Sequence, residues 1–186
     1  MSLKHALLGF LNYAPMTGYE LKRHFDNSIH YFWNAKLSQI YPTLDLMKKE
    51  GLLTMEVDYQ ENGPNRKVHH ITDAGREELR RWLLEPLDLS PNRVAFLVQV
   101  FFGGNLAKEE ILAQLRRNLA LHREQLAAYN GQVRDVVRRN IEDTGLKREG
   151  VFWSLTLESG VEYEKGWIKW CRKAIKGIEA MNDLDN

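Results

Sequence analysis

The spacing of apolar residues at the start of the chain predicts two short helices. The first covers residues 3–13 and ends before Pro15, because proline cannot continue the backbone hydrogen-bond ladder and disfavours helical geometry in the residue before it. Thr17 and Glu20 are three residues apart, which is the pattern of a capping box. They open a second helix, which we predict over residues 18–27.

A third helix is predicted from its apolar face and its termini. Ile40, Leu44 and Met47 recur at the spacing of one buried helix face, and Ser38 is the predicted N-cap. Gly51 supplies a left-handed stop. Counted from Ser38, a proline at position 42 falls at the edge of the first turn, where few amide bonds exist to lose.

The apolar period changes from helix-like to strand-like after the third helix. Residues 53–59 alternate apolar and polar side chains, as in a half-buried strand. The turn-forming residues 62–65 separate them from a weaker strand, residues 66–71, in which Val68 and Ile71 do not share a face. The turn beside the clear first strand favours a β-hairpin.

A fourth helix completes the first half of the chain. Its predicted N-cap is Thr72, it extends to about Leu84, and its inward-facing residues are predicted to be Leu79, Trp82 and Leu83. The order of three helices, a hairpin and a helix is that of a winged helix-turn-helix domain, in which the third helix enters the DNA major groove. We assign this domain to residues 1–85.

The second half of the chain, residues 93–182, has the pattern of long helices and is predicted to be a helical dimerisation and effector domain. Pro86 and Pro91 mark the boundary before it. One helix is predicted over residues 105–141, with apolar residues along one seam. A last helix, residues 149–181, is apolar on more than one face, so we expect these helices to pack between the subunits of a homodimer. The predicted fold class is mainly α with a small β-hairpin wing.

Composition and charge refine this picture. The chain has 186 residues and a net charge of +1, which does not by itself indicate nucleic-acid binding. However, residues 27–44 and 62–72 contain no acidic residue, and a local acid-free face is sufficient to bind an anionic surface. The apolar run at the N-terminus lacks the pattern of a signal peptide, and no stretch of about 18 apolar residues would span a membrane. We therefore expect a cytoplasmic protein.

No motif indicates an enzyme or a cofactor. The histidines and acidic residues do not have metal-ligand spacing, and nucleophile elbows, phosphate loops and paired carboxylates are missing from the sequence. The single cysteine, Cys171, excludes an internal disulfide framework. We expect Cys171 to be buried in a helix rather than to act as a redox sensor, because a sensing thiol needs exposure and a lowered pKa.

The residues from Ser2 to Leu83 resemble those of PadR-type transcriptional regulators. The resemblance rests on the sequences SLKHALLGFL, TGYELKRHFD, LSQIYPTLDLMKKEGLL and RKVHHITDAGREELRRWL, in this order. The second half is similar to the helical dimerisation domain of the larger members in helix content and length. The resemblance implies a dimeric DNA-binding repressor that a small molecule releases, a phenolic acid in some members and a hydrophobic drug in others.

The exposed face of the third helix carries side chains suited to DNA. Glutamine pairs with adenine, a threonine methyl group contacts the thymine methyl group, and hydroxyl groups suit phosphates. A dimer would read a palindromic operator on double-stranded DNA, with half-sites roughly 34 Å apart. The predicted DNA contacts are Lys36, Ser38, Gln39, Tyr41 and Thr43 near the third helix, Tyr19 and Lys22 in the second helix, and Asn65, Arg66 and Lys67 in the wing.

An aromatic effector would need an apolar site with a cationic or hydrogen-bonding partner. The candidate residues are Phe32, Trp33, His122, Arg123, Phe152, Trp153 and Trp167. The alternative for the aromatic residues is plain core packing, and for His122 a satisfied core histidine. The alternative for the whole protein is a dimeric winged-helix module that binds protein and not DNA, which retention on duplex DNA with a steep salt dependence would distinguish.

Overall fold

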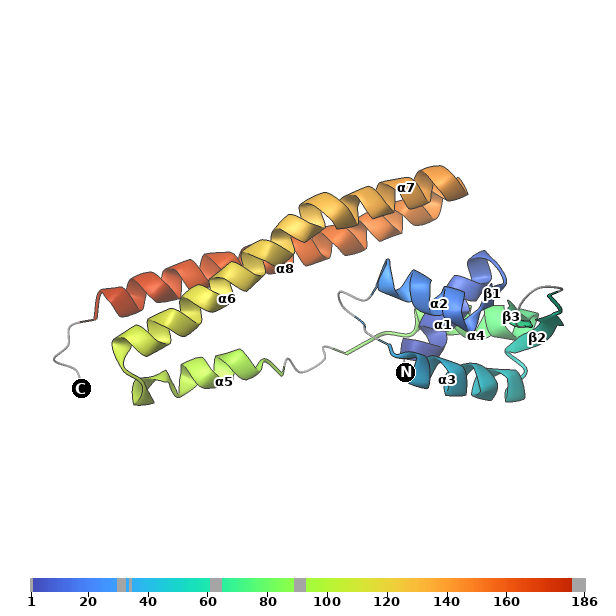
Figure 1. The fold of residues 1–186 in the computed structure, drawn as a ribbon, viewed down its shortest axis with the longest axis horizontal. Coiled ribbons are helices and arrows are strands. Elements are labelled where there is room, and N and C mark those ends of the chain that lie inside the picture. The colour runs from blue at the N-terminus through green and yellow to red at the C-terminus, as the bar shows by residue number, and fades with distance from the viewer. Residues whose placement is uncertain (1, 30–32, 34, 61–64, 89–92, 182–186) are drawn as a thin grey trace. The chain divides into compact units, whose positions relative to one another are not determined.

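The computed structural model describes residues 2–29, 33, 35–60, 65–88 and 93–181. The chain divides into two compact units, Met1–Leu89 and Ser90–Asn186 (Figure 1). The first unit contains a small sheet among short helices, and the second consists of helices.

The first unit has the element order of a winged helix-turn-helix domain. Its elements are α1 (Ser2–Tyr13), β1 (Met16–Thr17), α2 (Gly18–Asp26), α3 (Leu37–Lys49), β2 (Leu53–Asp58), β3 (Arg66–Ile71) and α4 (Asp73–Leu84). The predicted hairpin of β2 and β3 is confirmed, but the sheet has a third strand that the sequence did not indicate. The two residues of β1 pair antiparallel with β3, so that Met16 lies opposite His69, and the strand order is β1-β3-β2.

The predicted buried face of the third helix is confirmed. Ile40 and Met47 are fully buried and Leu44 is 1% exposed, and all three belong to one core with apolar residues of α1 and α2. Gly51 has a φ of 73°, which gives α3 the left-handed stop expected from glycine. The core therefore fixes α3 by its inner face and leaves its other face available.

The inward faces of β2 and α4 differ from the prediction. Leu53 is buried in β2, but Val57 is 38% exposed. The strand is therefore not half-buried along its whole length, although its apolar and polar residues alternate. In α4, Leu79 and Trp82 are half-buried whereas Leu83 is 67% exposed. The prediction for Leu83 is wrong because α4 meets the core through its first turns, and Leu83 lies one residue before the end of the helix.

Two close contacts fix α4 against the rest of the unit. The predicted cap is confirmed, since the amide of Gly75 donates to Thr72 Oγ1 over 3.1 Å. A Cβ atom on Gly75 would lie 2.1 Å from the carbonyl oxygen of Leu52, so only glycine fits there. Where α4 contacts α1, Glu78 forms an ion pair with Lys4 over 2.9 Å and a hydrogen bond with His5 over 3.2 Å.

The second unit is built from a long helical hairpin and a short helix. Its elements are α5 (Ala95–Phe101), a 3₁₀ turn (Gly103–Asn105), α6 (Lys108–Ala128), a π-helical turn (Tyr129–Val133), α7 (Arg134–Thr144) and α8 (Lys147–Glu179). Gly145, with a φ of 68°, ends α7, and α8 then returns alongside α7 and α6 (Figure 1). Among the described residues, no helix is long and apolar enough to cross a membrane.

The helix predicted over residues 105–141 is interrupted. Ile111, Leu115 and Leu119 are buried along one seam of α6, but a π-helical turn separates α6 from α7. In this turn the ring of Tyr129 lies against Gly160 of α8, where a Cβ atom would be 3.1 Å from the ring. The extra residue of a π-helical turn changes which side chains face α8 beyond this point.

The last helix is apolar on more than one face, as predicted. Leu157, Val161 and Ile168 are buried in α8, whereas Phe152 and Leu155 on the same helix are 57% and 61% exposed. In α5 no side chain is buried, although six of its seven residues are aliphatic or aromatic and the helix is followed directly by the exposed Phe102. Within one chain, therefore, apolar surface remains uncovered on α5 and α8.

Candidate nucleic-acid interface

Helix α3 begins two residues earlier than the sequence suggested. The N-cap is Lys36 and not Ser38, because the backbone amide of Ile40 donates to the Lys36 carbonyl over 3.1 Å. The side chain of Gln39 stabilises this start, since its Oε1 atom accepts the Lys36 amide over 3.0 Å. Because α3 begins at Leu37, the Leu37 side chain becomes half-buried. A helix that began after Ser38 would not need to bury this side chain.

This earlier start places Pro42 in the second turn of α3, not at the edge of the first. Proline has no N–H, so the carbonyl of Ser38 lacks the amide that an uninterrupted helix would provide four residues later. The sequence-based expectation that Pro42 would lose almost nothing was therefore too favourable. The side chain of Thr43 donates to the Gln39 carbonyl over 2.7 Å at the same level of the helix.

The predicted contacts on α3 lie on one exposed end of the helix. Lys36, Ser38 and Gln39 are exposed, and Thr43 is half-buried. Tyr41 is 48% exposed, but one edge of its ring lies against α2, where a Cβ atom on Gly18 would be 2.5 Å from Cε1. Contact with α2 thus limits the positions open to the Tyr41 ring.

The predicted capping box at the start of α2 is confirmed. The amide of Glu20 donates to Thr17 Oγ1 over 3.2 Å, and Glu20 Oε2 accepts the Thr17 amide over 2.8 Å. Tyr19 is 66% exposed in the first turn. Lys22 forms an ion pair with Asp26 one turn later, so a phosphate contact by Lys22 would compete with that carboxylate.

The wing strand is joined to α2 by an ion pair that the sequence did not indicate. Arg66 donates from Nη2 to Glu20 Oε1 over 2.5 Å, across 46 positions of sequence. The pKa of Glu20 lies below its usual value, first because its carboxylate accepts the Thr17 amide, and also because of the Arg66 guanidinium. The same carboxylate therefore caps α2 and positions the base of the wing.

The remaining wing residues are exposed. Lys67 lies on β3 opposite Val57, and Asn65 Oδ1 accepts the Gln60 amide over 3.4 Å. Residues 61–64, between β2 and β3 in the sequence, lie outside the described residues. Arg66 has five N–H donors, so its contact with Glu20 leaves donors for a phosphate.

The candidate effector residues are only partly brought together. The ring of His122 stacks on Trp167 with centroids 4.9 Å apart and planes 7° apart, and its Nδ1 atom is bonded to the buried carboxylate of Glu164. Trp153 precedes Trp167 by 14 residues, or about 21 Å along the axis of α8. Phe152, which precedes Trp153 in the sequence, is 57% exposed.

The other candidate effector residues lie elsewhere. Arg123 lies next to His122 in sequence but on a different flank of α6, where it lines a groove with Leu126. Trp33 is 41% exposed in the first unit, and Phe32 lies outside the described residues. Cys171 is fully buried, and this burial raises the pKa of its thiol, as expected for a packing residue rather than a sensor. Among the described residues, no group of three or more histidine, cysteine, aspartate or glutamate side chains is placed to hold a metal ion.

The capped α2, the exposed end of α3 and the β2–β3 wing define the class of the protein. A winged helix-turn-helix domain joined to a unit of long helices is the architecture of a DNA-binding transcriptional regulator. The model of the transcriptional regulator PadR-like family matches residues 7–81, and the model of the Virulence activator alpha C-terminal domain matches residues 92–179. The chain belongs to the PadR-like family of transcriptional regulators, which is not a family of enzymes.

Two relatives match along nearly the whole chain. A probable transcriptional regulator of Mycobacterium tuberculosis, Rv1176c, is 31% identical over 187 residues, covering 96% of this chain and 98% of the relative. The negative transcriptional regulator PadR of Bacillus subtilis is 28% identical over 185 residues, covering 98% of each chain.

Solved structures show the same fold. Bacillus subtilis PadR in complex with operator DNA has a TM-score of 0.83 and 26% identity, covering 96% of this chain and 99% of that one. A structure of Bacillus subtilis PadR with p-coumaric acid has a TM-score of 0.78 and 24% identity, covering 96% and 99% of the two chains. At 24% identity, the likeness to the p-coumaric acid complex shows the fold alone.

Proposed function

We propose that the protein is a homodimeric repressor that binds a palindromic operator and is released by a small aromatic or hydrophobic effector such as a phenolic acid. The observation that carries this proposal is the exposed, acid-free end of α3. Its inner face is held by fully buried apolar residues, so the polar end is presented by a fixed support. Rigid presentation is what base recognition in the major groove requires.

The proposed DNA surface combines three elements of the first unit. Gln39 and Thr43 of α3 would contact bases, whereas Lys36, Ser38 and Tyr41 would contact phosphates around them. The other proposed phosphate contacts are Tyr19, Lys22, Asn65, Arg66 and Lys67. The likeness to Bacillus subtilis PadR, whose structure includes operator DNA, supports this arrangement.

The proposed dimer would form through the helices of the second unit. Val98, Phe101 and Phe102 are 58%, 81% and 60% exposed near α5, and Phe152 and Leu155 are similarly exposed on α8. Apolar surface of this extent within one chain favours burial against a second copy. Two copies would then present two α3 helices to the half-sites of a palindrome.

The proposed effector response rests on the stacked His122 and Trp167. An aromatic ring beside them would extend the stack, and His122 is already bonded to a buried carboxylate. The p-coumaric acid complex of Bacillus subtilis PadR supports an aromatic acid as the ligand class. Such a ligand would release DNA only by binding more tightly to the protein conformation that does not bind the operator.

The decisive experiment first selects an operator from random DNA. It then compares the affinities of two Gln39 variants for that operator. Gln39→Ala removes both the proposed base contact and the cap of the Lys36 amide. Gln39→Glu keeps an oxygen that accepts this amide, so the thermal stability should stay at the wild-type value, while operator affinity should fall at least about tenfold because a carboxylate would face the DNA. Gln132→Glu adds the same charge to an exposed position of the second unit and should bind as the wild type does.

Two results would contradict this function. The first is a selection that enriches no palindrome. The second is a Gln39→Glu variant that binds the selected operator as tightly as Gln132→Glu does. A separate arm measures the wing: loss of Arg66 or Lys67 should reduce the slope of log affinity against log salt by roughly 0.9 for each phosphate contact removed.

A further inference from the structure

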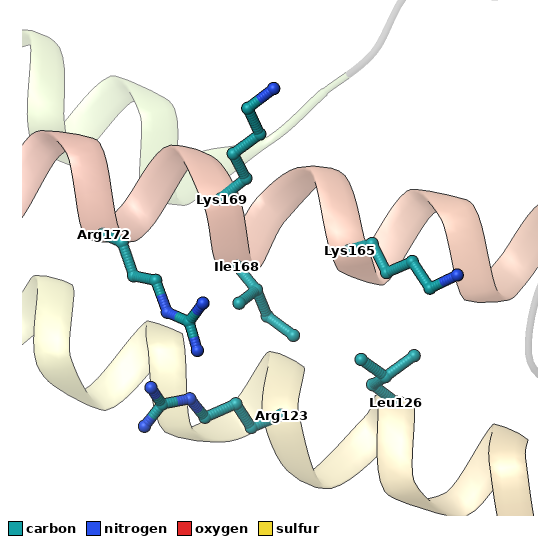
Figure 2. A pocket seen from close by; sticks show the side chains of 6 residues that line it. All are labelled: Arg123, Leu126, Lys165, Ile168, Lys169 and Arg172. Carbon is teal, nitrogen blue, oxygen red and sulfur yellow. The ribbon is translucent and has the colours of Figure 1, made fainter.

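A groove on the surface of the second unit has an unusual charge. It lies between α6 and α8, has a volume of about 450 Å³, and is lined by Arg123, Leu126, Lys165, Ile168, Lys169 and Arg172 (Figure 2). Four of the six lining residues are cationic and none is acidic. At 100° per residue, this flank of α8 is opposite the one that carries Trp167 and Trp170.

The two arginines of the groove face each other. Figure 2 shows the guanidinium groups of Arg123, from α6, and Arg172, from α8, pointing toward one another across the groove. Like charges at close range repel, and solvent only partly screens that repulsion. An anion between the two groups would turn this repulsion into attraction on both sides.

Elsewhere, glutamates of α8 form ion pairs with arginines of α6 and α7. Arg116 contacts Glu179 over 2.7 Å, and Arg134 contacts Glu158 over 2.8 Å. In the groove, Lys165 pairs with Glu162 of its own helix over 2.8 Å. Within the part of the chain that the structure describes, Arg123, Lys169 and Arg172 have no ion-pair partner. The groove is therefore a place where the hairpin leaves positive charge uncompensated.

The floor of the groove is apolar. Ile168 is 7% exposed and Leu126 is half-buried, so both present aliphatic surface below the charged groups. The volume falls within the range of small-molecule sites, which is about 300–1,000 Å³. An apolar floor beneath several cations suits a ligand with an apolar body and a strongly anionic group.

We propose that this groove binds a small organic anion with two or more negative charges, of the aryl or alkyl phosphate class. The anionic group lies between Arg123 and Arg172, because guanidinium groups bind phosphate oxygens in a bidentate manner, and the apolar body lies on Leu126 and Ile168. Lys165 and Lys169 add positive charge at the rim. This site is separate from the His122–Trp167 stack, and the proposal depends neither on operator binding nor on the effector response.

The test measures the binding of 1-naphthyl phosphate to the full chain by titration calorimetry. The measurement is made at pH 8, where the probe is a dianion. We expect a Kd of about 1 mM or lower from the size of the probe. The variant Arg123→Ala/Arg172→Ala should weaken binding by at least about tenfold for each guanidinium removed. The matched control, Arg117→Ala/Lys173→Ala, removes the same charge from exposed positions of α6 and α8 outside the groove and should bind as the wild type does.

Further arms separate charge from shape. Arg123→Lys/Arg172→Lys keeps the charge but loses bidentate contact, so it should bind more weakly than the wild type and more tightly than the alanine variant; it also replaces that variant as the test if the alanine variant does not fold. The neutral 1-naphthol and inorganic phosphate should each bind at least about tenfold more weakly than 1-naphthyl phosphate, because each lacks one part of the ligand.

Several outcomes would overturn the proposal. One is the absence of binding of 1-naphthyl phosphate at 10-fold above the expected Kd of about 1 mM. Another is equal weakening in the groove variant and in the control variant, which would indicate only a general charge effect. Equal binding of inorganic phosphate would remove the role of the apolar floor. If the alanine variant of the groove lost duplex DNA binding and the wild type did not bind the probe, the groove would be a nucleic-acid surface instead.

Discussion

Replacing Glu78 by glutamine should weaken the contact between α1 and α4. The Glu78 carboxylate contacts Lys4, Arg81 and His5, and the hydrogen bonds from Lys4 and then Arg81 lower its pKa from 4.5 to about 2. A difference of that size corresponds to roughly 3 kcal/mol in favour of the ionised form in the folded protein. Because the Arg81 side chain is 75% exposed, solvent screening reduces the expected loss of unfolding free energy to about 1–2 kcal/mol.

The pH dependence of this loss follows from the direction of the pKa change. Since the folded pKa lies below the unfolded value of 4.5, Glu78 stabilises the fold fully above about pH 5 and loses this contribution as the pH falls from about 4.5 to about 2. Urea unfolding of the wild type and Glu78→Gln should therefore differ most at pH 7 and converge toward pH 3. Carbon-13 NMR of the Glu78 carboxyl group measures its pKa directly.

The neighbouring Glu77 provides a matched control. Glu77 is exposed, and it forms no ion pair among the residues that the structure describes. Glu77→Gln should change the unfolding free energy by less than about 0.5 kcal/mol. The reasoning is refuted if the two variants are equally stable at pH 7, or if the deficit of Glu78→Gln is the same at pH 3.5 as at pH 7.

Three other features give direct tests. Gly75→Ala should destabilise the first unit by about 2–3 kcal/mol in thermal unfolding, because its Cβ atom would lie 2.1 Å from the Leu52 carbonyl oxygen, whereas Gly104→Ala meets no atom within 4 Å and should be nearly neutral. Burial lowers the pKa of His69, so its neutral form stabilises the fold above its unfolded pKa of about 6.5 and the melting temperature should fall as the pH decreases below this value. His69→Gln should reduce this pH dependence, and an unchanged profile would contradict the assignment. The Cys171 thiol should react with a disulfide reagent only after urea is added, and rapid labelling of the folded protein would argue against its burial.

The apolar spacing of the third helix was sufficient to predict its buried face but not its first residue. Ile40, Leu44 and Met47 are placed by helix periodicity alone. Ser38 has a good N-cap side chain, yet Lys36 is the N-cap, because Gln39 satisfies the amide of Lys36 and Leu37 becomes half-buried. Local preference for a cap was overridden by these two contacts.

The sheet shows where local pattern carries too little information. A strand of two residues, β1, has no measurable alternation, so the pairing of Met16 with His69 was not predictable. His69 is the buried side chain of β3, although Val68 and Ile71 are the apolar ones. Its burial depends on the neighbours that sheet pairing provides rather than on its own hydrophobicity.

Contacts between distant parts of the sequence cannot be predicted from the local pattern of apolar residues. Glu20 and Arg66, or Arg123 and Arg172, meet only after each helix or strand has taken a particular rotation about its axis. Periodicity predicts which face of a helix is buried, but not which residue of another element lies opposite. The chemistry of the wing base and of the groove therefore required the structure.

Each unit of this protein has its own hydrophobic core. The core of the first unit is made of residues between Leu3 and Leu79, and a core between α6 and α8 is made of residues between Leu119 and Ile175. An exchange of gene segments between these limits would therefore leave both cores whole. Recombination can then replace the DNA-binding domain as a block and leave the side chains of the helical unit unchanged.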